Sequence, residues 1–121
     1  MRIIVIDGQG GGIGRSLVEK LREALPGAEI IAVGTNAAAT ANMKKAGADV
    51  GATGENAVAY NCARTDVIVG PLGIILAGAM YGEITPRMAC AVAESGARKV
   101  LIPAAKQHMT IVGIEDRPLS R

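Results

Sequence analysis

Residues 8–14 form a glycine-rich stretch, GQGGGIG, between a short apolar run and a helical pattern. Glycine loses more conformational freedom on folding than any other residue, so five glycines in seven positions indicate a specific requirement. Such a loop lets a ligand approach the backbone, and the following helix offers unpaired N–H groups and a positive dipole end to a phosphate. We therefore expect phosphate or nucleotide binding here. The alternative is a tight turn that packs the helix on its strand without any ligand.

The spacing of the glycines distinguishes two loop patterns. G-x-G-x-x-G fails because the third position after Gly10 is Ile13, whereas G-x-x-x-G-x-G fits Gly8, Gly12 and Gly14. The second pattern resembles the cofactor loop of short-chain dehydrogenases. Those enzymes also need a Tyr-x-x-x-Lys pair, which neither tyrosine of this chain supplies, and they are much longer. We therefore do not expect their reaction.

The second strand-like run ends in Thr35 and Asn36, without the acid that accepts ribose hydroxyls in NAD enzymes. An arginine that would recognise a 2′-phosphate is also missing there. Thr35, Asn36 and the amide at the following helix start are nevertheless suited to contact a phosphate. The expected cofactor is a nucleotide or dinucleotide of unknown identity, with NAD(P) as the first candidate.

Acidic residues near the expected cleft have two interpretations each. Asp7 would repel an anion unless it faces away, meets a metal or accepts hydrogen bonds from the loop amides, and the last, as an Asx turn, is favoured. Glu55 and Asn56, which follow Thr53 and Gly54, either point into the cleft or cap and open the next helix. Catalytic residues cannot be assigned from these patterns.

His108, the only histidine, is an acid–base candidate, but a lone loop histidine is more typical of a solvated surface. The spacing of His108, Cys62 and Cys90 does not suit a metal site, so no metal is expected. Two cysteines without a C-x-x-C spacing indicate reduced thiols and a cytoplasmic location.

Apolar residues alternate between strand-like runs and helical periods along the chain. We expect helices near residues 13–25, 37–47, 54–65 and 86–95, and strands at 3–6, 29–33, 49–52, 66–69, 100–102 and 109–114. This alternation predicts βαβ units, and hence a single doubly wound, mostly parallel α/β sheet of five to six strands that is Rossmann-like. The domain is expected to span residues 1–114, followed by a polar tail over 115–121.

Doubly wound sheets bind ligands beyond the carboxyl ends of their strands, near the point where the strand order reverses. The residues that follow the predicted strands are unusually polar or glycine-rich: DGQGGGIG, GTN, TGEN, GPLG and PAAKQH. We therefore expect one ligand-binding edge, formed by Gly8, Gln9, Gly10, Gly11, Gly12, Ile13, Gly14, Thr35, Asn36, Thr53, Gly54, Glu55, Asn56, Gly70, Pro71 and Gly73.

The composition argues against two classes of partner. The net charge is +2, with 13 basic and 11 acidic residues scattered along the chain, and Phe and Trp are absent, so neither a nucleic-acid footprint nor stacking platforms are expected. The sequence contains no bilayer-length apolar run and no signal-peptide pattern, so membrane association is not expected.

Residues 73–84, GIILAGAMYGEI, form an apolar segment longer than a simple connection requires. An exposed segment of this kind marks association, so it is expected to wall the ligand site, to form a subunit contact, or both. We predict a homodimer or a higher oligomer built from dimers, with Ile75, Leu76, Met80 and Tyr81 near the contact.

Together, the motifs IDGQGGGIG, GTN, AGADVGATGENA, GPLGII and LIP resemble a family of short bacterial proteins known as a domain of unknown function and described as Rossmann-like. The resemblance covers nearly the whole chain and implies the fold but no activity. The residues themselves predict a small protein that binds a nucleotide or phosphate cofactor. The alternatives are a ligand-sensing or protein-interaction module without catalysis, and a small enzyme acting on a phosphorylated metabolite.

Overall fold

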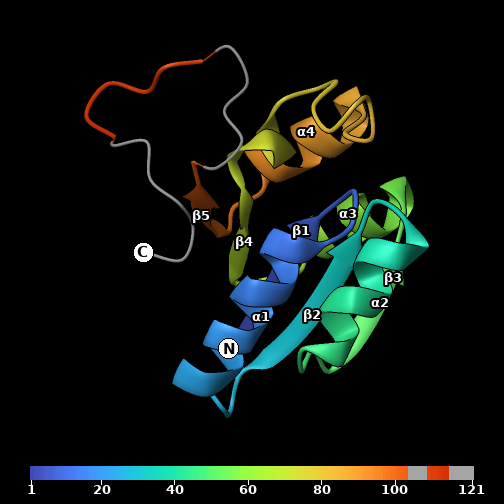
Figure 1. Ribbon diagram of the computed structural model, residues 1–121, viewed down its shortest axis with the longest axis vertical. Coiled ribbons are helices and arrows are strands. Elements are labelled where there is room, and N and C mark those ends of the chain that lie inside the picture. Colours follow the sequence, from blue (N-terminus) through green and yellow to red (C-terminus); the bar gives the residue numbers. More distant parts are fainter. Residues whose placement is uncertain (104–108, 115–121) are drawn as a thin grey trace.

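Five strands form one parallel sheet in the computed structural model, which describes residues 1–103 and 109–114 (Figure 1). The sheet order is β3-β2-β1-β4-β5, and all four pairings are parallel. The strands are β1 (Arg2–Asp7), β2 (Glu29–Gly34), β3 (Val50–Thr53), β4 (Val67–Pro71) and β5 (Arg98–Ile102). The predicted Rossmann-like α/β architecture is therefore confirmed.

Helices cover both faces of the sheet. They are α1 (Gly12–Ala24), α2 (Ala37–Lys45), α3 (Glu55–Cys62), the short 3-10 helix η1 (Leu72–Ile75) and α4 (Pro86–Glu94). Successive residues of a strand point to opposite faces, so Ile3 and Val5 pack with α1 and α2, whereas Ile4 and Ile6 pack with α3, η1 and α4. This double burial explains why β1 is a continuous apolar run.

The chain leaves the central strand β1 in one direction and returns beside it from the other. β1 pairs with β2 from Arg2 to Asp7 and with β4 from Ile3 to Val5, so the strand order reverses between β1 and β4. In sheets of this type the ligand crevice lies at this point, outside the carboxyl ends of the strands. The glycine-rich loop and the segment after β4 flank this crevice.

The predicted helix starts are confirmed by their caps. The Asn36 side chain accepts a hydrogen bond from the amide of Ala39 at 2.9 Å. The Thr85 hydroxyl accepts one from the amide of Met88 at 3.1 Å, and Pro86 occupies the first turn of α4. The third helix ends at Cys62, earlier than the predicted residue 65.

The predicted sixth strand at residues 109–114 is wrong. Residues 111–114 form a turn in which the amide of Ile114 donates to the carbonyl of Ile111 at 3.1 Å, and Gly113 has φ 89°. The prediction rested on apolar and β-branched residues, but a strand also needs a hydrogen-bonded neighbour. In the described part of the chain, β5 pairs only with β4, and Val112 is 96% exposed. His108 and the polar tail over 115–121 lie outside the described residues.

One stretch of the sheet next to β5 has little helical cover. An apolar groove of about 450 Å³ lies along α1, β1, β4 and β5, and its lining includes Leu21, Val69, Val100 and Ile102. Val100 is 41% exposed within it. None of the helices in residues 1–103 and 109–114 is long and apolar enough to cross a membrane.

The corrected position of Val112 leads to a stability prediction. Val112→Ala should change the free energy of unfolding by less than about 0.5 kcal/mol, as expected for an exposed side chain. Val33→Ala, at a fully buried position in β2, should cost about 1.5 kcal/mol or more because two buried methyl groups are lost. Urea denaturation of both variants measures the difference. A cost at Val112 similar to that at Val33 would contradict the exposed turn.

Candidate functional site

Asp7, the last residue of β1, holds both ends of the glycine-rich loop. Its Oδ1 accepts a hydrogen bond from the amide of Gly8 at 2.8 Å, and its Oδ2 accepts one from the amide of Gly14 at 2.7 Å. The residue is 4% exposed. Burial raises the pKa of Asp7 above its ordinary value, against the lowering effect of the two amides. Asp7 therefore accepts hydrogen bonds from the loop amides, as the sequence favoured, but its partners are Gly8 and Gly14 and not the residue two positions on that an Asx turn requires.

Three glycines of the loop are closely packed. Gly11 has φ 73°, and a Cβ there would lie 2.9 Å from backbone atoms of Ala39 in α2. A Cβ on Gly14 would lie 2.5 Å from the sulfur of Met43 and 2.8 Å from the Cβ of Asp7. A Cβ on Gly8 would meet side-chain atoms at 2.6–2.9 Å. Gly11 and Gly14 are therefore explained by packing whether or not a ligand binds, whereas the atoms near Gly8 are the ends of side chains that can move.

Gly10 and Gly12 have no such requirement. Both are exposed, neither has a positive φ, and a Cβ at either position would meet no atom within 4 Å. In residues 1–103 and 109–114, the amides of Gly10, Gly12 and Ile13 find no hydrogen-bond acceptor. They lie at the positive end of α1, where unpaired N–H groups favour an anion.

A carboxylate missed by the sequence reasoning lies beside these amides. Oε1 of Glu83 accepts three hydrogen bonds: from the backbone amide of Gln9 at 2.8 Å, from the Thr35 hydroxyl at 2.5 Å and from the side-chain amide of Asn36 at 3.0 Å. The Thr35 hydroxyl, followed by the Gln9 amide, lowers the pKa of Glu83, so the group is ionised at neutral pH. The structure thus brings Gln9, Thr35 and Asn36 together around an acid from the segment after β4.

The sequence did contain a signal for Glu83. It is the only charged residue between positions 67 and 86, within an otherwise apolar stretch. The segment that carries it lies against the glycine-rich loop, since the sulfur of Met80 is 2.7 Å from the position a Cβ would take on Gly8. Residues 73–84, called the wall segment below, therefore lie beside the glycine-rich loop, and their contact with a ligand stays a prediction.

The predicted residues after β3 lie further along the same edge. The Thr53 hydroxyl is hydrogen bonded to that of Thr40 at 2.8 Å, and the Gly54 amide donates to the carbonyl of Gly34 at 2.9 Å. Oε2 of Glu55 accepts a hydrogen bond from the Thr85 hydroxyl at 2.5 Å. Asn56 is exposed on the first turn of α3. Glu55 therefore connects α3 to the start of α4, and its contact with a ligand stays a prediction.

The predicted residues after β4 are placed less favourably for a ligand. Gly70 and Pro71 are buried, and a Cβ on Gly70 would lie 2.5 Å from the carbonyl oxygen of Ile6 in the neighbouring strand. The glycine at position 70 is thus explained by strand packing. Gly73 is half-buried in η1, in ordinary contact distance of Ala79.

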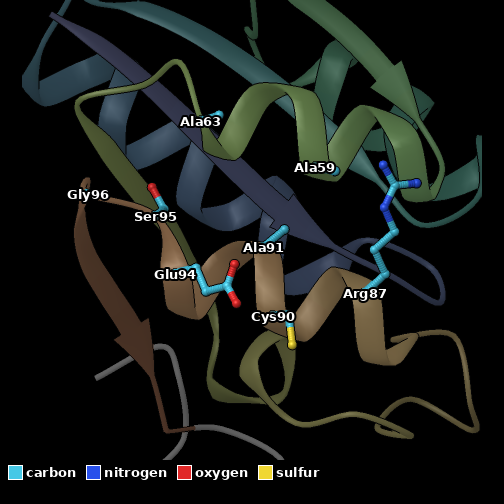
Figure 2. Close-up of a pocket in the computed structure, with 8 residues that line it drawn as sticks. All are labelled: Ala59, Ala63, Arg87, Cys90, Ala91, Glu94, Ser95 and Gly96. Atoms are coloured by element: carbon cyan, nitrogen blue, oxygen red, sulfur yellow. The ribbon is translucent and has the colours of Figure 1, made fainter.

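The groove drawn in Figure 2 lies elsewhere, between α3 and α4. It has a volume of about 510 Å³ and is lined mainly by small side chains, together with Arg87, Cys90 and Glu94. None of the residues predicted for the ligand edge lines it. Because the glycine-rich loop offers amides that are unpaired within the described residues, the crevice beside it is the better candidate site.

The fold and this loop define a Rossmann-like α/β protein with a glycine-rich loop at its topological switch point. The chain belongs to the family described as domain of unknown function DUF3842, whose model matches residues 2–121. No protein with a curated description matches the chain.

One similar solved structure is described as a dodecameric FMN-dependent UbiX-like decarboxylase from Escherichia coli O157:H7. It is 24% identical with a TM-score of 0.57, over 91% of this chain and 69% of that one. At this identity the similarity supports the shared fold.

The buried Asp7 gives a pH-dependent prediction. Its pKa is raised in the folded state, so folding binds protons, and the free energy of unfolding should fall as pH rises from 3.8 through the raised pKa. Asp7→Asn should lack this fall. It should also cost about 1–3 kcal/mol, because one loop amide loses its acceptor.

Urea denaturation of both proteins between pH 3.5 and 7 isolates the effect, since the other carboxylates are common to the two. The stability advantage of the parent protein over the variant should shrink with rising pH. An advantage that grows with pH would mean that the loop amides stabilise the Asp7 anion more than burial penalises it.

Proposed function

We propose that this protein binds a nucleotide-type ligand at the carboxyl edge of the sheet, with a phosphate on the amides of Gly10, Gly12 and Ile13. One observation carries the proposal: these amides are unpaired within the described residues, and two of the three residues are glycines that neither packing nor backbone conformation requires. Close approach of a ligand to the backbone supplies the missing reason for glycine there.

The charges around the loop fit one orientation of such a ligand. Asp7 is buried beneath the loop with both oxygens on backbone amides, so it is poorly placed to repel an anion above the loop. Glu83 lies to one side, next to the Gln9 amide, and it would repel a second anionic group. The phosphate therefore belongs over Gly10 and Gly12, with an uncharged part of the ligand toward Glu83.

The class of nucleotide is left open by these contacts. A flavin mononucleotide deserves a test, because the similar solved structure is described as FMN-dependent. NAD(P) is the other main candidate, on the strength of the glycine pattern before α1. Coenzyme A, ATP, GTP, FAD and sugar phosphates complete a panel in which every member presents a phosphate.

The test pairs this panel with Gly12→Ala. A ligand at about 100 times its dissociation constant should add about 2.7 kcal/mol to the stability of the unmodified protein, which raises its melting temperature by roughly 10 °C. Gly12→Ala should abolish that shift, because the new methyl group projects into the space assigned to the phosphate. The variant without ligand should be as stable as the parent, or up to about 1 kcal/mol more stable, since alanine is favoured over glycine in helices.

Gly11→Ala provides the contrast. It should cost about 2 kcal/mol or more without ligand, because the position has a positive φ and abuts the Ala39 backbone. Thermal-shift measurements thus separate a glycine kept for folding from one kept for binding. The proposal fails if no phosphate compound shifts the melting temperature, or if Gly12→Ala retains the full shift.

We further propose self-association through the wall segment. Ile75 and Met80 pack against the apolar cluster of their own chain, whereas Tyr81 is 92% exposed. Of the four residues predicted at a subunit contact, Tyr81 is therefore the one most available to a second copy. An exposed aromatic side chain beside a crevice is typical of an interface anchor.

Tyr81→Lys should convert the oligomer to monomers, because it removes the aromatic anchor and places a charge in the contact. Val100→Lys is the matched control, since it puts the same charge on the other exposed apolar area, in the groove beside β5. Light scattering at micromolar concentration measures the mass of each. A monomeric parent protein, or dissociation by Val100→Lys alone, would contradict the proposed contact.

A further inference from the structure

Glu83 is held in one position by three donors from two different loops. The Gln9 amide belongs to the glycine-rich loop, whereas Thr35 and Asn36 follow β2. Asn36 is itself fixed, because its side chain accepts from the amide of Ala39 and also donates to the carbonyl of Gln9 at 2.9 Å. The carboxylate is therefore preorganised before any ligand arrives.

All three hydrogen bonds end on the same oxygen of Glu83. Its other oxygen, Oε2, accepts no hydrogen bond from residues 1–103 or 109–114. The side chain is only partly buried, and it borders Gly8, two residues before the open Gly10. An ionised oxygen is thus left unpaired next to the unpaired amides of the loop.

In other Rossmann-like proteins, an acid at this position of the fold binds the ribose of the cofactor. In dinucleotide-binding sheets, an acid at the end of the second strand accepts hydrogen bonds from the ribose hydroxyls while the phosphate lies on the glycine-rich loop. This chain has Thr35 and Asn36 at that place instead. Those two residues bind Glu83, which comes from the segment after β4, so an acid is present where β2 ends although β2 does not supply it.

Resting on the proposed function, we infer that Glu83 accepts the 2′-hydroxyl of a ribonucleotide whose phosphate lies on the glycine-rich loop. The ligand class is then a nucleotide with an unmodified ribose. A 2′-phosphate is rejected, because it would face a carboxylate that is already charged. A 2′-deoxyribose is disfavoured, because it leaves Oε2 desolvated without a donor.

Two pairs of probes each differ only at the 2′ position: ADP is compared with 2′-deoxy-ADP, and AMP with adenosine 2′,5′-bisphosphate. Calorimetric titration of the parent protein should show ADP binding about 10- to 100-fold more tightly than 2′-deoxy-ADP, the range of a hydrogen bond to a charged group. The bisphosphate should bind more weakly than AMP despite its extra charge.

Glu83→Gln keeps the shape of the side chain and an oxygen for the Gln9 amide but removes the charge. This variant should bind ADP about as weakly as the parent protein binds 2′-deoxy-ADP. It should also bind adenosine 2′,5′-bisphosphate no more weakly than AMP. Glu94→Gln, at an exposed acid on α4, is the control for the change in net charge and should leave all affinities unchanged.

Four outcomes overturn the inference. If Glu83→Gln tightens every probe and inorganic phosphate alike, the carboxylate is a competitor of the ligand anion and not an acceptor of its hydroxyl. If ADP binds but its preference over 2′-deoxy-ADP survives in Glu83→Gln, another group reads the ribose. If the phosphate panel yields a ligand while no adenosine probe binds, this inference falls and the proposed function stands; if nothing with a phosphate binds, both fall.

Discussion

The buried carboxylate of Asp7 is the interaction on which the geometry of the glycine-rich loop depends. It ties the end of β1 to the first turn of α1, because its two oxygens accept hydrogen bonds from the amides of Gly8 and Gly14. Burying an anion is costly, and these two hydrogen bonds offset part of that cost. Between these two ends, Gly11 packs against α2, and the amides of Gly10 and Gly12 are left without an acceptor in the described part of the chain.

The five glycines of the loop therefore serve different needs. Gly8 lets side chains of the wall segment approach the backbone, Gly11 does so for α2, and Gly14 for the side chains of Asp7 and Met43. Of these three, only Gly11 has a positive φ. Gly10 and Gly12 are surrounded by open space. A glycine pattern alone does not separate these needs, because close packing and ligand approach both exclude a side chain.

The wall segment after β4 is strained where it approaches the loop. Met80 and Tyr81 have φ values of 58° and 56°, a conformation that costs of order 1–3 kcal/mol for each residue with a side chain. The segment keeps this shape because Ile74 and Ile84 are buried at its two ends. Strain of this kind persists only where the surrounding packing over-determines it, and here the result is that Glu83 reaches Thr35 and Asn36.

The sequence by itself determined the sheet and the caps of α2 and α4. The signals were local: continuous apolar strands, helical periods, and the helix-start residues Asn36, Thr85 and Pro86. They predicted the elements correctly because each depends on burial or backbone hydrogen bonding within a few positions of the chain. The prediction of a strand at 109–114 was wrong because a strand also needs a neighbouring strand to pair with, and local sequence does not show whether one is present.

Only the tertiary structure decided the contents of the crevice. Glu83 lies 47 positions from Asn36 and 74 from Gln9, and no spacing rule relates residues from three loops that meet only because parallel strands end at one edge. The division of the glycines and the burial of Gly70 likewise depend on which backbone lies opposite, a distance that exists only after the sheet has formed.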